Sequence, residues 1–225
     1  MKIIAIIPAR GGSKAIPLKN IKKLNKVPLI NYTIKNCIKS KIFDYIIVST
    51  DSKKIFNTAK KHKNIMVFNR SRNIAKDTSR LEETISDVLL KIYILKKYQP
   101  DWIFVLQPTS PLRSSNTLIK AKNILKKNNK INSLVALLLL NGDPGKLINQ
   151  RFVCFEKNGK YRRQDRQPIF MESGALYCMK YKYFKKTKKL KEKKPFGFQI
   201  PKIENVDIDD LQDFRIAEAL TESKL

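Results

Sequence analysis

The chain has 225 residues, of which 47 are Lys or Arg and 19 are Asp or Glu, so its formal net charge is +28. This length suffices for one large α/β domain, and the apolar content of 42% excludes a disordered chain. No apolar run approaches the roughly 20 residues of a membrane-spanning helix, which predicts a cytoplasmic protein without a membrane partner.

Strands and helices are predicted to alternate along the first 140 residues. Residues 2–7 are an apolar run that ends at Pro8 and a Gly-rich turn, which indicates a buried strand and not a secretory signal. Further strands are expected at 45–49, 65–68, 102–106 and 133–140. Helices are expected at 28–38, 52–61, 82–98 and 117–125. This alternation predicts an α/β fold with a doubly wound, mostly parallel sheet.

The pattern changes after residue 141. Residues 151–157, followed by Asn158-Gly159, read as the first half of a β-hairpin. The last elements expected are strands at 174–179 and 195–200 and a helix at 209–220. We therefore expect a single domain over residues 1–225, with a small insertion subdomain at about 141–195.

The three cysteines, Cys37, Cys154 and Cys178, are odd in number and widely spaced, and each lies in an apolar pattern. This favours reduced, buried thiols over a disulfide framework or a metal site.

A basic, glycine-rich loop follows the first strand. Gly11 and Gly12 allow main-chain N–H groups to approach an anion, and Arg10, Lys14 and Lys19 add three cations. The loop is neither a Walker loop nor a Rossmann fingerprint, and a basic surface turn is the alternative. Its position at the carboxyl end of a strand favours a site for a nucleoside triphosphate.

Two acidic side chains alternate near the C-terminus. In an extended segment Asp207 and Asp209 share one face, where their carboxylates repel each other unless a cation lies between them. Close to a triphosphate, such hard oxygen ligands imply Mg²⁺. The alternative is that these acids cap the last helix, a role that we assign to Asp210 and Asp213 instead.

These motifs resemble those of the acylneuraminate cytidylyltransferases, which make CMP-sialic acid and related CMP-sugars, and the resemblance runs from Ile4 to Glu218. The matching segments are 8–20, 48–51, 69–70, 75–79, 106–113, 162–165 and 206–214. The resemblance implies a fold like that of nucleotide-diphospho-sugar transferases. It also implies Mg²⁺-dependent transfer of CMP from CTP to the anomeric hydroxyl of a nine-carbon α-keto acid sugar.

The resemblance assigns a role to each matching side chain. Catalytic roles fall to Arg10, Lys14, Lys19 and Asp209. Nucleotide binding falls to Gly11, Gly12, Ser13, Asn20, Arg70 and Ser79. Contacts to the sugar fall to Gln107, Arg163 and Gln164, and the Mg²⁺ ligands are Asp207 and Asp209. Because the family is dimeric, the insertion is expected to pack against a second subunit in a homodimer.

The chain departs from the family pattern at three positions. Ala15 replaces a Gly, which costs backbone freedom if that position needs a positive φ. Ser71 replaces a Pro, and Ser173 replaces an Asn that an Arg often precedes by two residues. These departures leave open legionaminate, pseudaminate or Kdo as the acceptor. They also leave open a homologue that binds nucleotide without transferring it.

The net charge suggests a function of a different class, a basic nucleic-acid-binding protein. Its support is the charge together with the lysine-rich stretch 180–194. However, most lysines are scattered over many predicted helices, and no RNA-binding or helix-turn-helix signature accompanies them. We therefore expect no nucleic-acid partner.

Overall fold

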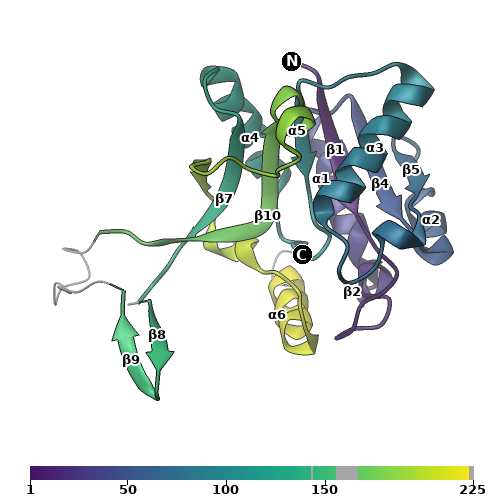
Figure 1. Cartoon of the computed structure of the whole chain (residues 1–225). Coiled ribbons are helices and arrows are strands. Elements are labelled where there is room, and N and C mark those ends of the chain that lie inside the picture. The colour runs from purple at the N-terminus through teal and green to yellow at the C-terminus, as the bar shows by residue number, and fades with distance from the viewer. Residues whose placement is uncertain (143, 156–166, 223–225) are drawn as a thin grey trace.

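The structure is a computed structural model that describes residues 1–142, 144–155 and 167–222. Its centre is a seven-stranded sheet in the order β11–β7–β10–β6–β1–β4–β5 (Figure 1). The strands are β1 (Ile3–Pro8), β4 (Tyr45–Thr50), β5 (Met66–Asn69), β6 (Trp102–Val105), β7 (Ser133–Leu139), β10 (Phe170–Lys180) and β11 (Phe196–Gln199). Among these strands β10 alone runs antiparallel to its neighbours, so the predicted mostly parallel α/β sheet is confirmed.

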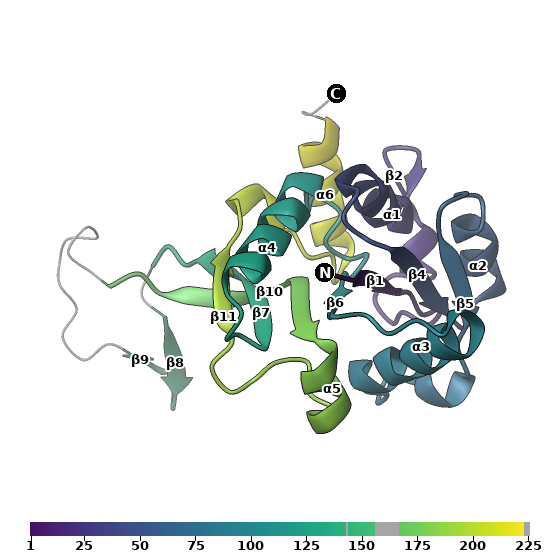
Figure 2. The same cartoon turned by 90° about the horizontal axis from the view of Figure 1, so that it is seen from above.

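Helices cover both faces of this sheet (Figure 2). Along β1, Ile3, Ala5 and Ile7 pack into one core cluster, and Ile4 and Ile6 pack into a second cluster on the other face. The first cluster includes side chains of α1 (Leu29–Ser40), α2 (Lys53–Ala59) and α4 (Ser115–Lys127). The second includes side chains of α3 (Leu81–Lys96) and α5 (Tyr181–Thr187). This is why an uninterrupted apolar run, and not an alternating one, forms the central strand.

The last helix, α6 (Leu211–Glu222), packs into a third cluster with residues of the loop after β1. In that cluster Ile16 of the loop is buried together with Ile208 and Phe214. The contact brings the C-terminal acidic segment to the glycine-rich loop, although the two are far apart in the sequence.

Short elements complete the described chain. They are the 3-10 helices η1 (Lys19–Ile21), η2 (Arg72–Ile74) and η4 (Lys202–Asn205) and the strand pairs β2 (Lys23–Leu24) with β3 (Val27–Pro28) and β8 (Gly145–Ile148) with β9 (Arg151–Cys154). None of the described helices is long and apolar enough to cross a membrane.

An arm extends away from the main body. It consists of the β8–β9 hairpin and the distal ends of β7 and β10 (Figure 1). Only part of the range 141–195 lies in this arm, because residues 177–180 pair with β6 in the main sheet and Phe184 of α5 is buried in the second cluster. The expected turn at Asn158-Gly159 lies outside the described residues. The hairpin that the structure shows turns at Asn149 and Gln150, with φ of 48° and 62°.

All three cysteines are free. Cys37 and Cys178 are buried and Cys154 is half-buried, so the expectation of reduced thiols agrees with the structure.

The chain order of the strands reverses at β1. From β1 the chain goes to β4 and β5 on one side, and then returns to place β6 on the other side of β1. In open α/β sheets ligands bind at such a reversal, beyond the carboxyl ends of the strands. The fold therefore points to the segments that follow β1 and β6.

Candidate active site

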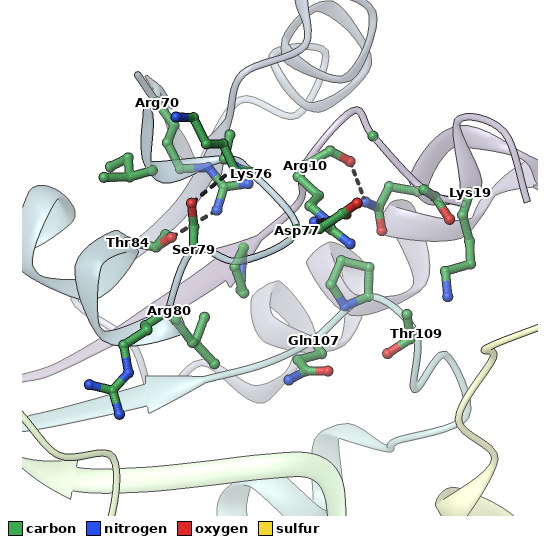
Figure 3. Close-up of a pocket in the computed structure, with 18 residues that line it drawn as sticks. Arg10, Lys19, Arg70, Lys76, Asp77, Ser79, Arg80, Thr84, Gln107 and Thr109 are labelled. Atoms are coloured by element: carbon green, nitrogen blue, oxygen red, sulfur yellow. Dashed lines mark hydrogen bonds and ion pairs between the residues drawn. The ribbon is translucent and has the colours of Figure 1, made fainter. Parts of the chain in front are cut away.

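A cavity of about 360 Å³ opens at this reversal point. Segments that follow β1, β5 and β6 and the start of α3 contribute to its walls. Labelled side chains around it in Figure 3 include Arg10, Lys19, Arg70, Ser79 and Gln107. These five predicted site residues come from four separate motifs and meet in one cavity.

The glycine-rich loop is held by main-chain contacts. The N–H of Gly11 donates to Asp51 Oδ1 at 2.8 Å, and Asn20 Nδ2 donates to the carbonyl of Arg10 at 2.9 Å. A Cβ at Gly11 would lie 2.8 Å from Cβ of Ser52, so this position needs a glycine for close approach to α2. Ala15 is not among the described residues with positive φ; Leu18, with φ of 51°, takes that conformation. The departure at position 15 therefore introduces no strain.

An ion-pair bridge joins the glycine-rich loop to the loop between η2 and α3. The carboxylate of Asp77 lies 2.6 Å from Arg10 Nη1 (Figure 3) and 3.1 Å from Lys14 Nζ. The hydrogen bond from Lys14, together with the charges of Lys14 and Arg10, lowers the pKa of Asp77. Two of the three predicted cations thus share one carboxylate, which offsets only part of their charge. Lys14 itself is largely exposed and is not part of the cavity lining.

Arg70 presents free donors in the cavity wall. Its side chain is buried, and Nη1 donates to Thr84 Oγ1 at 2.8 Å. Burial lowers the pKa of Arg70. Its Nε and Nη2 atoms have no hydrogen-bond partner within the part of the chain that the structure describes. Because buried donors are rarely left unpaired, these atoms mark a place where a ligand acceptor fits.

Ser79 also lines the cavity, but its hydroxyl is engaged in the loop that carries it. Ser79 Oγ donates to the carbonyl of Asn73 and accepts from the N–H of Lys76. These bonds close the loop between η2 and α3, so the structure shows a loop-fixing contact for this side chain. Ser71, at the departure from the family pattern, accepts from the N–H of Asn73 and begins η2.

The acidic segment adjoins the cavity. Lys19 Nζ donates to the carbonyl of Ile208 and lies 3.7 Å from Asp209 Oδ1, and the N–H of Ile208 donates to the carbonyl of Thr109 at 2.8 Å. The two carboxylates differ in burial, because Asp209 is 85% exposed whereas Asp207 is half-buried. Asp207 Oδ1 is buried and has no hydrogen-bond partner among the described residues.

Asp210 and Asp213 form the helix cap, as predicted. Asp210 Oδ1 accepts from the N–H groups of Gln212 and Asp213, and Asp213 Oδ2 accepts from those of Asp209 and Asp210. The capping role therefore does not require Asp207, or the side chain of Asp209.

Gly174 brings the acidic segment close to Gln107. A Cβ at Gly174 would lie 3.0 Å from Asp207 Oδ2 and 3.7 Å from Gln107 Oε1, so the absence of a side chain leaves room for both. Asp207, Gln107 and β10 thus share one corner, although neither Asp207 nor Asp209 lines the cavity itself. Arg163 and Gln164 lie outside the described residues.

Several site residues were not predicted from the sequence. Asp77, Thr84, Thr109 and Asp51 each contact a predicted residue or line the cavity. Asp51, Asp77 and Thr109 lie in the matching segments 48–51, 75–79 and 106–113 but were assigned no role, and Thr84 lies in the helix predicted at 82–98. Their pairing with residues of other motifs depends on the tertiary structure.

The geometry matches what comparison with known proteins finds. A sequence model of the family described as "Cytidylyltransferase" matches residues 4–224. The chain belongs to the cytidylyltransferase family. This cytidylyltransferase is therefore a nucleotidyltransferase, and its cavity lies where a nucleotide site is expected in the fold.

Relatives match the cytidylyltransferase over nearly its whole length. It is 32% identical to the CMP-N,N'-diacetyllegionaminic acid synthase of Legionella pneumophila, over 99% of this chain and 97% of that protein. It is 31% identical to a pseudaminic acid cytidylyltransferase of Campylobacter jejuni, over 98% and 96%. Among solved structures, CMP:2-keto-3-deoxy-manno-octonic acid synthetase complexed with CTP is similar with a TM-score of 0.75, covering all of both chains at 13% identity. This last likeness supports the fold.

Proposed function

We propose that this cytidylyltransferase transfers CMP from CTP to the anomeric hydroxyl of a nine-carbon, acylneuraminate-type α-keto acid sugar, releasing pyrophosphate. The observation that carries this proposal is the cavity in which Arg10, Lys19 and Arg70 converge from separate strand ends beside Gln107. The similarity to relatives named for legionaminic and pseudaminic acids supports an acceptor of this class.

The cationic side chains act on the triphosphate. Arg10, Lys14 and Lys19 contact the β- and γ-phosphates and stabilise the negative charge of the departing pyrophosphate. Gly11, Gly12 and Ser13 approach the phosphates with main-chain N–H groups, and Asn20 fixes the loop through the carbonyl of Arg10. Since Arg10 and Lys14 pair with Asp77, these two cations exchange a carboxylate for phosphate when CTP binds.

Base selection falls to Arg70. Cytosine presents two adjacent acceptors, its carbonyl oxygen and ring N3, and the unpaired Nε and Nη2 of Arg70 are two adjacent donors. Ser79 maintains the loop that forms the facing wall. We therefore expect CTP to be preferred over ATP.

The carboxylates fit Mg²⁺. Asp207 has an unpartnered, buried carboxylate oxygen, and Asp209 is exposed next to it in the chain. The described residues contain no cluster of three or more His, Cys, Asp or Glu side chains that would hold a metal, so phosphate and water would supply the remaining ligands, as is usual for Mg²⁺. When bound by Asp207 and Asp209, the ion supplies charge neutralisation at the α-phosphate and lowers the pKa of the attacking hydroxyl.

The acceptor sugar is oriented by Gln107, Arg163 and Gln164, and the guanidinium of Arg163 binds its carboxylate. The acceptor approaches the α-phosphate at the Gln107 side of the cavity, next to Gly174 and Asp207. Legionaminate, pseudaminate and Kdo are the alternative acceptors for the same chemistry.

The test is pyrophosphate release with CTP, Mg²⁺ and a panel of sialic, legionaminic, pseudaminic and Kdo acids. We expect release with one nine-carbon acid, and loss of release when ATP replaces CTP or Mg²⁺ is chelated. Release with Kdo alone would contradict the acceptor class. No release in protein that still binds CTP would identify a homologue that has lost transfer, and absence of CTP binding would overturn the proposal.

Asp77 is predicted to compete with CTP. Because its carboxylate pairs with Arg10 and Lys14, the phosphates must displace it, so Asp77→Asn should tighten CTP binding by about three- to tenfold. Calorimetric titration with CTP and with pyrophosphate measures this. The control is Asp101→Asn, which removes the same charge at the opposite edge of the sheet, where Asp101 accepts from the N–H of Lys2. Weaker CTP binding by Asp77→Asn would show that the carboxylate assists binding.

The arm supports the proposal of a homodimer. Leu147, Phe152 and Phe155 are 72%, 63% and 61% exposed, and a two-stranded hairpin is only marginally stable alone. A second copy of the chain that covers these side chains would bury the exposed apolar surface and stabilise the hairpin. We also place the protein in the cytoplasm. We propose no nucleic-acid partner, because lysines of the 180–194 stretch such as Lys180 and Lys191 are bonded within the chain.

Sedimentation velocity tests the homodimer. We expect a dimer for the wild-type chain and a monomer for the double variant Phe152→Ser, Phe155→Ser, because two aromatic side chains at the contact are lost. Leu90→Ser on α3, which is 59% exposed but lies outside the arm, serves as the control and should remain dimeric. A monomeric wild-type chain would contradict the assignment.

A further inference from the structure

Arg113 is a buried cation that the roles above do not use. It follows β6 in the segment that also carries Gln107 and is only 1% exposed, which makes it the largest fully buried side chain among the described residues. Burial lowers the pKa of Arg113 to about 10, which leaves the side chain charged at neutral pH. Burial of a guanidinium is costly unless its donors are paired. Both terminal nitrogens of Arg113 are paired, whereas its Nε has no hydrogen-bond partner among the described residues.

The guanidinium of Arg113 joins three separate elements. Nη1 donates to the main-chain carbonyls of Ala175 in β10 and of Gln107, the latter at 3.4 Å. Nη2 donates to Thr33 Oγ1 of α1 at 3.0 Å and reaches the Gln107 carbonyl at 3.5 Å. The main chain of Arg113 is itself fixed, because its carbonyl accepts from Asn36 Nδ2 at 2.6 Å. A planar fork of donors can make all these bonds at once, whereas an ammonium group cannot.

The contact with Ala175 falls where the sheet is irregular. The pairing of β10 with β7 shifts register between Ser173 and Tyr177, so residues 174–176 are not held by a regular ladder. Gly174 lies inside this irregular stretch and faces Gln107 and Asp207. Arg113 donates to the carbonyl of Ala175 within this stretch, and so holds β10 where its pairing with β7 is interrupted.

We propose that Arg113 is a positioning residue that holds the Gln107 main chain and the β10 irregularity at a fixed spacing, and so sets the acceptor side of the cavity. The assignment of this corner to the acceptor rests on the proposed function. The positioning itself rests on the contacts of the guanidinium, which are independent of the reaction.

Arg113→Lys is the decisive variant, since it keeps the charge and loses the fork. We expect amide hydrogen exchange in segments 106–110 and 173–177 to rise about tenfold or more, in line with the loss of charge-assisted hydrogen bonds. The KM for the acceptor should rise by a similar factor of about ten, with the KM for CTP changed by less than about twofold. Arg113→Gln, which buries no unpaired charge, is the second variant if the lysine form does not fold.

Thr33→Val is the matched control, because it removes the bond to α1 and leaves both carbonyl bonds of Arg113 in place. It should leave exchange in the two segments unchanged. Unchanged exchange in the Arg113 variants would overturn the proposal, and so would a rise spread evenly over the chain or an equal rise in both KM values. If the wild-type enzyme releases no pyrophosphate, the proposed function fails, while the exchange measurement still decides the positioning role.

Discussion

Asp207→Asn is expected to reduce pyrophosphate release by about 10³-fold or more in kcat, in a protein that keeps its fold. An amide of the same shape preserves the packing beside Gly174 but removes the charge that a divalent cation requires. Asp209→Asn should have the same effect. The measurements are steady-state release of pyrophosphate and the dependence of CTP binding on Mg²⁺ concentration.

The control for this pair is Asp210→Asn. Asp210 Oδ1 caps α6 by accepting from two N–H groups, and Asn is an equally good capping residue, so neither turnover nor the melting temperature should change appreciably. Undiminished turnover of Asp207→Asn and Asp209→Asn would eliminate the assignment of these carboxylates to the metal. A collapse of the fold in Asp207→Asn would instead show a structural role.

Lys19→Met is expected to lower kcat/KM by about 10²- to 10³-fold, the loss that follows removal of one preorganised charge at an active site. The side chain is only 12% exposed and is held by the carbonyl of Ile208 and the carboxylate of Asp209. Lys19 therefore links the glycine-rich loop to the acidic segment. Steady-state kinetics with CTP varied at saturating acceptor measures the effect.

Lys14→Met is the comparison for Lys19, since it removes the same charge from the same loop. Lys14 is 84% exposed and pairs with Asp77, so we expect a smaller loss, of about tenfold, because an exposed charge is screened by water. Equal losses for the two variants would show that burial of the cation does not set its contribution.

The sequence predicted those parts of the fold whose signal is local. The strand after Met1, the loop 8–20 and the cap at Asp210 each follow from the residues in that segment, and the structure agrees with them. Helix α5 was missed because its seven residues bury only Phe184 and its lysines read as a charged surface stretch. The turn expected at Asn158-Gly159 lies outside the described residues. The turn between β8 and β9 was not predicted, because it uses Gln150 in a left-handed conformation that Gln rarely adopts.

The candidate site was predicted in composition but not in its pairings. The alternating pattern of residues 207–209 correctly predicted that Ile208 faces away from the two flanking acids. It gave no reason for Asp207 to be half-buried and Asp209 to be exposed. That difference arises from β10, which packs Gly174 against Asp207. The ion pair between Asp77 and Arg10 likewise joins the loop after β1 to the loop after β5, so no local sequence pattern predicts it.

Strand β10 has a consequence for protein engineering. Its first residues, from Phe170, pair with β7 in the arm, and its last residues pair with β6 beneath α5, with the irregular stretch 174–176 between them. A chimera that takes its arm from a relative therefore keeps the native corner beside Gln107 and Asp207 only if the splice in β10 is made before Ser173. A junction there would exchange the arm alone, whereas a junction after Tyr177 would also exchange the stretch that Arg113 holds.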